Sequence, residues 1–165
     1  MKKMLVVLSI LLLLFGFLSC SSTKSGKTKS NPVRFKDRIG RVTKVDFQNK
    51  SRTVLVGRHH FQYEREENSE GQLYVETLWR FRAPFDDELA SGVTEARSKI
   101  ILTAYPRELT RPAGLWVASM EGRNEVKLEG GQGWVTLPLT EGAKKYFKNI
   151  AEDLRIEYRM GVREF

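Results

Sequence analysis

The stretch LYVETLWRF, residues 73–81, carries the clearest strand pattern in the chain. Every second residue from Leu73 to Phe81 belongs to one set, which is apolar except for Thr77, and the residues between them include Glu76 and Arg80. Successive side chains of an extended chain point to opposite faces, so this alternation is typical of a strand with one buried face. The stretch therefore predicts a fold organised around a sheet.

Further strands are predicted on both sides of this one. The charged segment 64–72 ends in Glu70-Gly71 and predicts a hairpin loop. Later, Gly122-Arg123-Asn124 and residues 130–133 separate short apolar runs and predict turns. Such spacing favours a mainly β fold, an antiparallel β-sandwich or barrel-like sheet of about 7–9 strands. The other runs that we expect to form strands are residues 39–47, 53–63, 94–105, 115–120, 125–129 and 134–139.

One helix is predicted near the C-terminus. Thr140 is a favourable N-cap residue and Glu141 falls in the first turn, so we expect a helix from about residue 141 to 152. The alternation of Leu154, Ile156, Tyr158 and Met160 then predicts a last strand, although the helix can instead run on to about residue 159. The alternative fold is α+β, with one antiparallel sheet and a helix packed on it.

The N-terminal stretch has the features of a secretory signal. Lys2 and Lys3 precede an apolar segment, residues 4–18, interrupted only by Ser9 and Gly16. As a helix this segment is roughly 22 Å long, which is shorter than the roughly 30 Å hydrocarbon core of a bilayer. A basic start followed by a short apolar run is typical of a signal peptide, and an uncleaved hydrophobic anchor is the alternative.

The residues at the end of this segment, Phe17-Leu18-Ser19-Cys20, resemble the lipobox of bacterial lipoproteins. The resemblance covers the first twenty residues and implies cleavage between Ser19 and Cys20, with diacylglycerol (fatty acids such as palmitate) on the Cys20 thiol. Cys20 is the only cysteine of the chain, so no disulfide is expected. Ser21 stands where an Asp retains enteric lipoproteins in the inner membrane, which implies the outer membrane, on its periplasmic or surface face.

These features predict three parts: a signal peptide at 1–19, a lipidated N-terminus and flexible basic linker at 20–33, and a single β-rich domain at 34–165. Residues 24–44 hold eight basic residues against one acidic residue, whereas residues 45–165 hold eighteen against nineteen. We therefore assign the basic excess to the tether. It is expected to be attracted to anionic headgroups or cell-wall polymers, at about 1 kcal/mol per basic residue, or to be merely solvated. An exported, tethered chain is not expected to bind nucleic acid, despite its pI near 9.7.

No motif predicts a catalytic, cofactor or metal site. His59 and His60 would point to opposite faces of a strand, so they cannot share a metal ion there. The acidic residues of segment 64–70 lack the calcium-loop pattern, and Asp86-Asp87 lie in a charged turn where solvated carboxylates are the rule. Aromatic residues in strands usually fill a core, and lining a ligand cavity is the alternative. The tryptophans in question are Trp79, Trp116 and Trp134.

The sequence therefore favours a non-enzymatic envelope protein that binds or scaffolds another envelope protein or a cell-wall or lipid component. The alternative is a ligand-binding module with an aromatic-lined cavity for a lipid or a glycan. A third hypothesis is an envelope hydrolase, for which the sequence offers no assignable residues.

Overall fold

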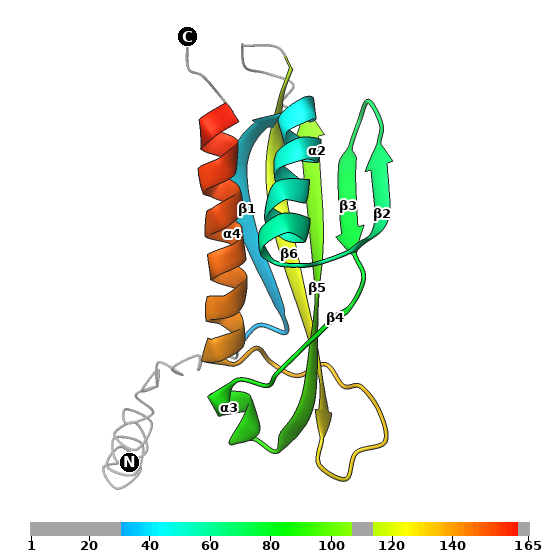
Figure 1. Ribbon diagram of the computed structural model, residues 1–165, viewed down its shortest axis with the longest axis vertical. Coiled ribbons are helices and arrows are strands. Elements are labelled where there is room, and N and C mark those ends of the chain that lie inside the picture. The colour runs from blue at the N-terminus through cyan, green and yellow to red at the C-terminus, as the bar shows by residue number, and fades with distance from the viewer. Residues whose placement is uncertain (1–30, 107–113, 162–165) are drawn as a thin grey trace, which may run out of the picture.

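The computed structural model describes residues 31–106 and 114–161 of the chain, so Ser19 and Cys20 lie outside the described residues. Within these ranges, six strands form one open antiparallel sheet, accompanied by three α-helices (Figure 1). This is the α+β arrangement that the sequence offered as the alternative. The strands form a single sheet rather than the two packed sheets of a sandwich, and there are fewer of them than expected.

Two long strands form the centre of the sheet. β5 (Val93–Pro106) and β6 (Leu115–Leu128) have 14 residues each and pair along their length. β1 (Arg34–Thr43) pairs with β6 and forms one edge. On the other side, β3 (Leu73–Thr77) pairs with β5, and β2 (Tyr63–Asn68) forms the opposite edge. The short β4 (Arg80–Arg82) pairs with the first half of β5.

Helices cover one face of this sheet (Figure 1). α2 (Lys44–Arg52) follows β1 directly and continues as a π-helix, η1 (Thr53–Arg58). α3 (Asp86–Leu89) is short, and α4 (Glu141–Gly161) has 21 residues. No helix within residues 31–106 and 114–161 is both long enough and apolar enough to span a membrane.

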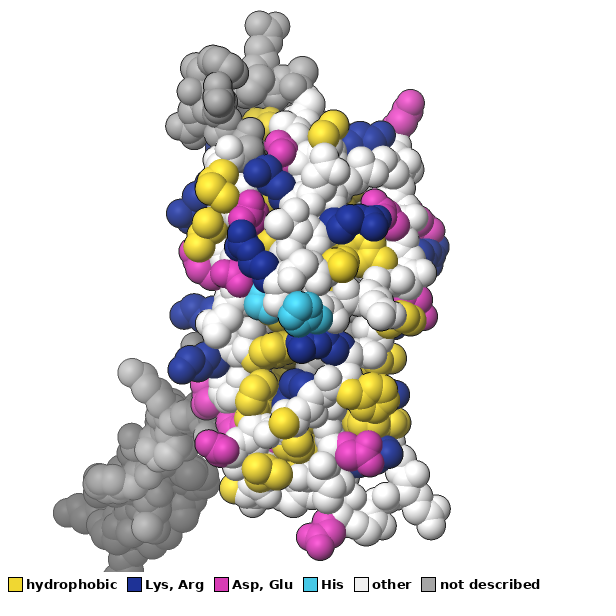
Figure 2. Space-filling model, in the orientation of Figure 1, with side chains coloured by type: hydrophobic (Ala, Val, Ile, Leu, Met, Phe, Trp, Pro, Cys, Tyr) yellow, Lys and Arg dark blue, Asp and Glu magenta, His cyan; other side chains and the backbone are white. Residues whose placement is uncertain are grey.

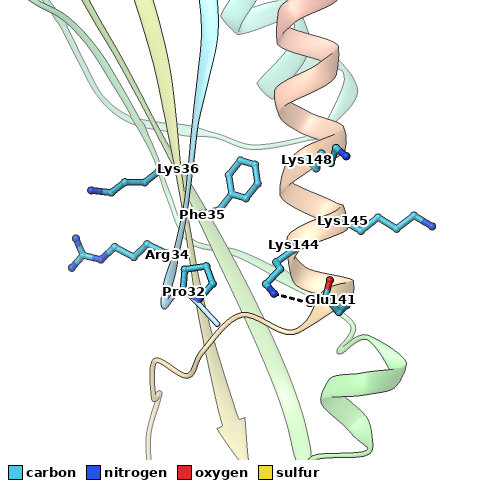
Figure 3. A pocket seen from close by; sticks show the side chains of 8 residues that line it. All are labelled: Pro32, Arg34, Phe35, Lys36, Glu141, Lys144, Lys145 and Lys148. Carbon is cyan, nitrogen blue, oxygen red and sulfur yellow. Dashed lines mark hydrogen bonds and ion pairs between the residues drawn. The ribbon is translucent and has the colours of Figure 1, made fainter. Parts of the chain in front are cut away.

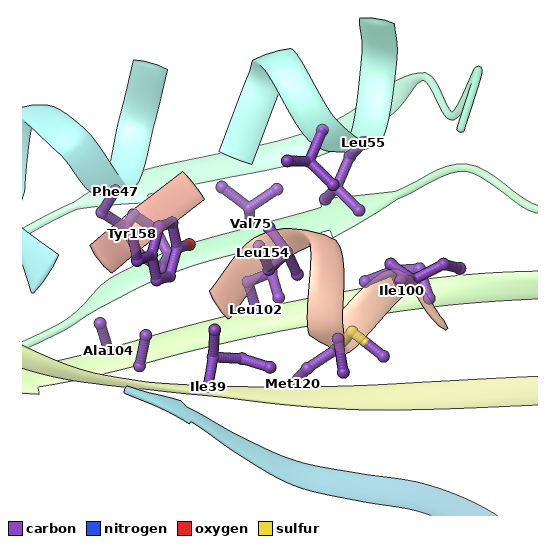
Figure 4. Packing of buried hydrophobic residues seen from close by; sticks show 14 of the residues in the cluster. Ile39, Phe47, Leu55, Val75, Ile100, Leu102, Ala104, Met120, Leu154 and Tyr158 are labelled. Atoms are coloured by element: carbon purple, nitrogen blue, oxygen red, sulfur yellow. The ribbon is translucent and has the colours of Figure 1, made fainter. Parts of the chain in front are cut away.

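The core lies between the sheet and the helices (Figure 4). Phe47 of α2 and Tyr158 of α4 pack with ring centroids 6.4 Å apart, and the Tyr158 hydroxyl shares a 2.6 Å hydrogen bond with the Ser51 hydroxyl. Each fully buried large apolar side chain contributes about 1.5–3 kcal/mol. Other buried members include Ile39, Leu55, Val75, Ile100, Leu102, Ala104, Trp116, Ala118, Met120, Phe147 and Leu154.

The strand expected at residues 53–63 is wrong. Residues 53–58 form η1, and only Tyr63 belongs to a strand. Thr43 begins the preceding helix, because its hydroxyl accepts a hydrogen bond from the Asp46 amide at 3.1 Å. The β-branched residues of this segment favour an extended conformation. Val54 and Leu55, however, are adjacent and both buried, which is typical of a helix packed against a sheet.

The turn expected at residues 122–124 is also wrong, because β6 runs unbroken through these positions. Gly122 marks a close approach rather than a turn. It lies opposite Phe35 of β1 and under the ring of Phe147 of α4. A glycine inside a strand often permits such an approach.

Other boundaries also differ from the first expectation, and at residues 154–160 the alternative of a continued helix holds. Residues 154–160 continue α4, since Leu154 and Tyr158 are four residues apart and buried on one side of the helix. The run 134–139 contributes only an isolated bridge, at Val135. The run 73–81 is divided into β3 and β4, and residues 44–47 of the first expected strand belong to α2. The expected loop at 64–72 is mostly strand, because β2 extends to Asn68.

No helix covers the second face of the sheet among the residues described, and charged side chains dominate it. One row crosses all five main strands in register: Arg65, Glu76, Ile101, Glu121 and Lys36. Ile101 at its centre is only 7 % exposed, although no element is layered over it. We call this surface the open face.

A buried ion pair lies where β4, β5 and α3 meet. Arg82 donates to both carboxylate oxygens of Glu88, each at 2.7 Å, and its guanidinium lies 3.9 Å from the centroid of the Phe85 ring. Asn124 bonds to both partners. Burial alone raises the pKa of Glu88, but the hydrogen bonds from Arg82 and the Phe85 amide outweigh burial and lower it.

The close approach at Gly122 predicts the effect of adding a single methyl group. The Cβ atom of Gly122→Ala would lie 2.5 Å from the Phe147 ring, so we expect a loss of about 1–3 kcal/mol in the free energy of unfolding. Gly133→Ala is the control, because no atom lies within 4 Å of its Cβ position. Chemical denaturation of the two variants measures the difference, and equal stabilities would contradict the close packing of α4 on β6.

The Arg82–Glu88 pair predicts a loss of stability in acid. A carboxylate with a lowered pKa stabilises the fold above its unfolded pKa of about 4.3, and this contribution disappears as the pH falls through the folded pKa. Glu88→Gln should cost about 3–5 kcal/mol at neutral pH, because it leaves a buried arginine unpaired.

The variant should also lose less stability than wild type between neutral pH and pH 3, as followed by denaturant unfolding. The control is Glu95→Gln, which removes an exposed partner of Lys127 and should cost less than about 1 kcal/mol. Parallel pH profiles for wild type and Glu88→Gln would refute this assignment.

Candidate functional site

The three tryptophans lie in different environments. Trp116 is in the core. Trp79 and Trp134 both lie against Arg97, whose Cζ atom is 4.7 Å and 4.3 Å from the two ring centroids. Arg97 also bonds to Glu125 at 2.5 Å. These rings therefore stack on a paired arginine of the same chain, and neither of the two surface hollows described below is lined by a tryptophan.

The two histidines lie side by side on the surface at the end of η1, where Figure 2 shows them in cyan. They are not on a strand, so the alternation argument does not apply to them. His59 Nε2 lies 2.8 Å from a carboxylate oxygen of Asp153, and His60 has a left-handed backbone with φ of 54°. No group of three or more metal-binding side chains occurs in the part of the chain that the structure describes.

The acidic residues singled out in the sequence have separate structural partners. Asp87 accepts a 2.8 Å hydrogen bond from the Gly142 amide at the start of α4, and this bond lowers the pKa of its carboxyl group. Asp86 is exposed and lies beside it in α3. Glu66 pairs with Arg52, and Glu67 pairs with Arg65. These carboxylates do not converge on one point.

Lys99 is a buried cation that the sequence did not reveal. Its ammonium lies 2.6 Å from a carboxylate oxygen of Glu64 and 2.9 Å from one of Glu76, which joins β5 to the strands β2 and β3. Burial lowers the pKa of Lys99, but the hydrogen bonds to the two glutamates outweigh it and raise the pKa above its ordinary value. The same contact lowers the pKa of Glu76. Lys99 therefore stays charged and holds the open face together.

A shallow hollow of about 420 Å³ lies beside this network on the open face. Ile101, Thr103 and Ser119 provide uncharged lining, while Lys36, Arg38 and Glu121 stand at its β1 side. It offers a small neutral area within a charged surface.

A cluster of basic side chains lies elsewhere, in a groove of about 700 Å³ between β1 and the first turns of α4 (Figure 3). Pro32 and Phe35 supply its apolar lining. Glu141 is the single acidic residue of the lining, and it pairs with Lys144 at 2.6 Å. The five basic residues of the lining are Arg34, Lys36, Lys144, Lys145 and Lys148. We call this site the basic groove.

Three of these five cations have a carboxylate partner, Lys144 in Glu141 and the other two in Glu121. Glu121 of β6 is shared by Arg34 and Lys36, at 3.4 Å and 3.7 Å. Within residues 31–106 and 114–161, no ion pair involves Lys145 or Lys148, and both side chains are exposed. Figure 3 shows the cations on both sides of the groove: Arg34 and Lys36 point away from α4 on one side, and Lys145 points away from β1 on the other.

The end of the tether is fixed at this groove. The Pro32 carbonyl accepts a 2.9 Å hydrogen bond from the Leu139 amide, and the Asn31 side chain accepts a 2.7 Å bond from Lys144. The last residues of the tether therefore contact α4 and the segment that leads into it, and Pro32 lines the basic groove.

The position of these cations corrects the assignment of the basic excess to the tether. Five of the eight basic residues of segment 24–44 lie in β1 and at the start of α2, and those of β1 face the open side of the sheet. The signal was present in the sequence, because basic residues at positions 34, 36 and 38 recur with the period of a strand. The lysines of α4 join them only through the fold.

No model of a known protein family matches this chain, and no curated protein sequence matches it.

Proposed function

We propose that this protein is a lipid-anchored component of the bacterial cell envelope that binds or scaffolds another envelope component and catalyses no reaction. Its anchor is lipid on Cys20. Residue 21 is Ser rather than Asp, which favours the outer membrane as its location. The apolar segment 4–18 and Phe17-Leu18-Ser19-Cys20 support export and lipidation.

The observation that carries the binding role is the open face. Among the described residues, helices cover one side of the sheet only, and a filled core occupies the space beneath them. The uncovered side presents five strands of polar and charged side chains held in place by ion pairs such as Lys99–Glu76 and Arg97–Glu125. A rigid surface of this kind suits a macromolecular partner better than a small molecule.

The side chains that could take part in catalysis have structural roles instead, which supports a function without catalysis. Asp87 caps α4, Glu88 is held by Arg82, and His59 is held by Asp153. Each of these groups has a structural partner, and none of them lines the two hollows on the surface.

Lipidation is tested by labelling bacterial cells with a clickable palmitate analogue. Wild-type protein should become labelled and Cys20→Ser should not, because the thiol is the attachment point. Ser21→Ala is the matched control, since it keeps the cysteine and should be labelled like wild type. An unlabelled wild-type protein, or a labelled Cys20→Ser, would refute the anchor.

The binding surface is tested by photo-crosslinking in intact cells. A photoreactive amino acid replacing Thr103 or Ser119 on the open face should yield a discrete crosslinked partner. The same substitution at Val45, which is 65 % exposed on α2, is the control and should yield none. Crosslinks from Val45 alone would place the partner on the helical side and contradict the proposal.

A further inference from the structure

We infer that the basic groove is a second attachment site, which docks the domain on the phosphate-bearing headgroups of the anionic membrane that holds its lipid anchor. The inference rests on the proposed anchor at Cys20. It adds a defined protein surface and a defined orientation to that anchor.

Two of the groove cations, Lys145 and Lys148, form no ion pair with the described part of the chain. Cations near the N-terminus of a helix oppose the helix dipole, yet Lys144, Lys145 and Lys148 all lie in the first turns of α4. Within the described chain, Lys145 and Lys148 have no ionic partner that would offset this effect. The groove therefore offers positive charge to something outside the domain.

The arrangement of the cations suits an extended surface rather than one small anion. The five basic side chains stand on both sides of the groove and do not converge, as the directions of Arg34, Lys36 and Lys145 in Figure 3 show. A single phosphate would contact only one or two of them. A layer of headgroups can meet several at once, and each basic residue near an anionic surface strengthens binding about fivefold.

The groove is also the part of the domain closest to the anchor along the chain. Pro32 lines it and lies twelve residues after Cys20, so the two are separated by at most about 43 Å even when the chain is fully extended. Tethering at such a distance gives a high effective concentration of membrane at the groove. A site that is weak in free solution is therefore sufficient.

The two edges of the sheet differ in charge. Open-face positions of β1 hold Arg34, Lys36, Arg38 and Arg41, while the opposite edge strand β2 holds three glutamates and one arginine. Each glutamate of β2 is paired with a cation, so an anionic surface attracts the β1 edge more strongly than the β2 edge. Docking at the groove therefore turns β2 away from the membrane, since β1 and β2 are at opposite ends of the strand order (Figure 1).

The experiment uses the lipidated protein reconstituted in vesicles of phosphatidylcholine, with or without an equal part of phosphatidylglycerol. Lysines are acylated with a water-soluble ester and read by mass spectrometry. At low salt, Lys36, Lys145 and Lys148 should react several-fold more slowly on anionic than on neutral vesicles, whereas Lys127 should react equally on both. High salt should remove the protection.

Two double variants distinguish the effect of the groove lysines from the effect of the overall net charge. Lys145→Gln with Lys148→Gln should abolish the protection of Lys36. Arg41→Gln with Lys44→Gln lowers the net charge by the same amount at the other end of β1. This variant should retain the protection of Lys36. Both pairs of residues are exposed, so neither variant is expected to unfold the domain.

Flotation on neutral vesicles distinguishes the two proposals. Protein that floats there without lysine protection on anionic vesicles refutes the groove and leaves the anchor intact. If the protein does not float on neutral vesicles, the anchor is refuted. The groove is then tested by the protection of its lysines when anionic vesicles are added. The inference would also be overturned if free glycerol phosphate protected these lysines as well as anionic vesicles do. An equal loss of Lys36 protection in the two double variants would overturn it too.

Discussion

The contact between Gly122 and Phe147 sets the distance between α4 and the sheet, and the surface beside it follows from that distance. Without a side chain at Gly122, the Phe147 ring can lie directly on β6. Phe35, which is the β1 neighbour of Gly122 in the sheet, then stacks on Phe147 with centroids 5.8 Å apart. Phe35 also lines the basic groove, so a core contact forms the base of a surface site.

Pattern reasoning succeeded where one physical effect dominated. β3 was recognisable because one of its faces is buried and the other is not, which gives a period of two. It failed at residues 53–58, where local β propensity conflicts with the tertiary packing of Val54 and Leu55. It failed again at Gly122, since a glycine that permits helix packing has the same sequence signature as one that permits a turn.

The charge pattern shows a related limit. Composition along the chain located an excess of positive charge near the N-terminus, but only the register of β1 places Arg34 and Lys36 on an edge of the sheet. The lysines of α4 are more than one hundred residues further along the chain and contribute to the same groove. Contacts of this kind depend on the packing of α4 against β1, which no local pattern encodes. The lipobox-like motif, by contrast, is local, and it stays a prediction because it lies outside the described residues.

The polarity of the sheet links these features. Lys99 neutralises glutamates of β2 and β3, and arginines pair with the other two glutamates of β2. The positive charge that remains unbalanced therefore lies towards the β1 edge. A domain whose unbalanced positive charge lies at one edge experiences a torque near an anionic bilayer as well as an attraction. A tether alone limits distance and leaves orientation free. Groove and tether together would fix both, and they would leave the open face accessible at a defined angle to the membrane.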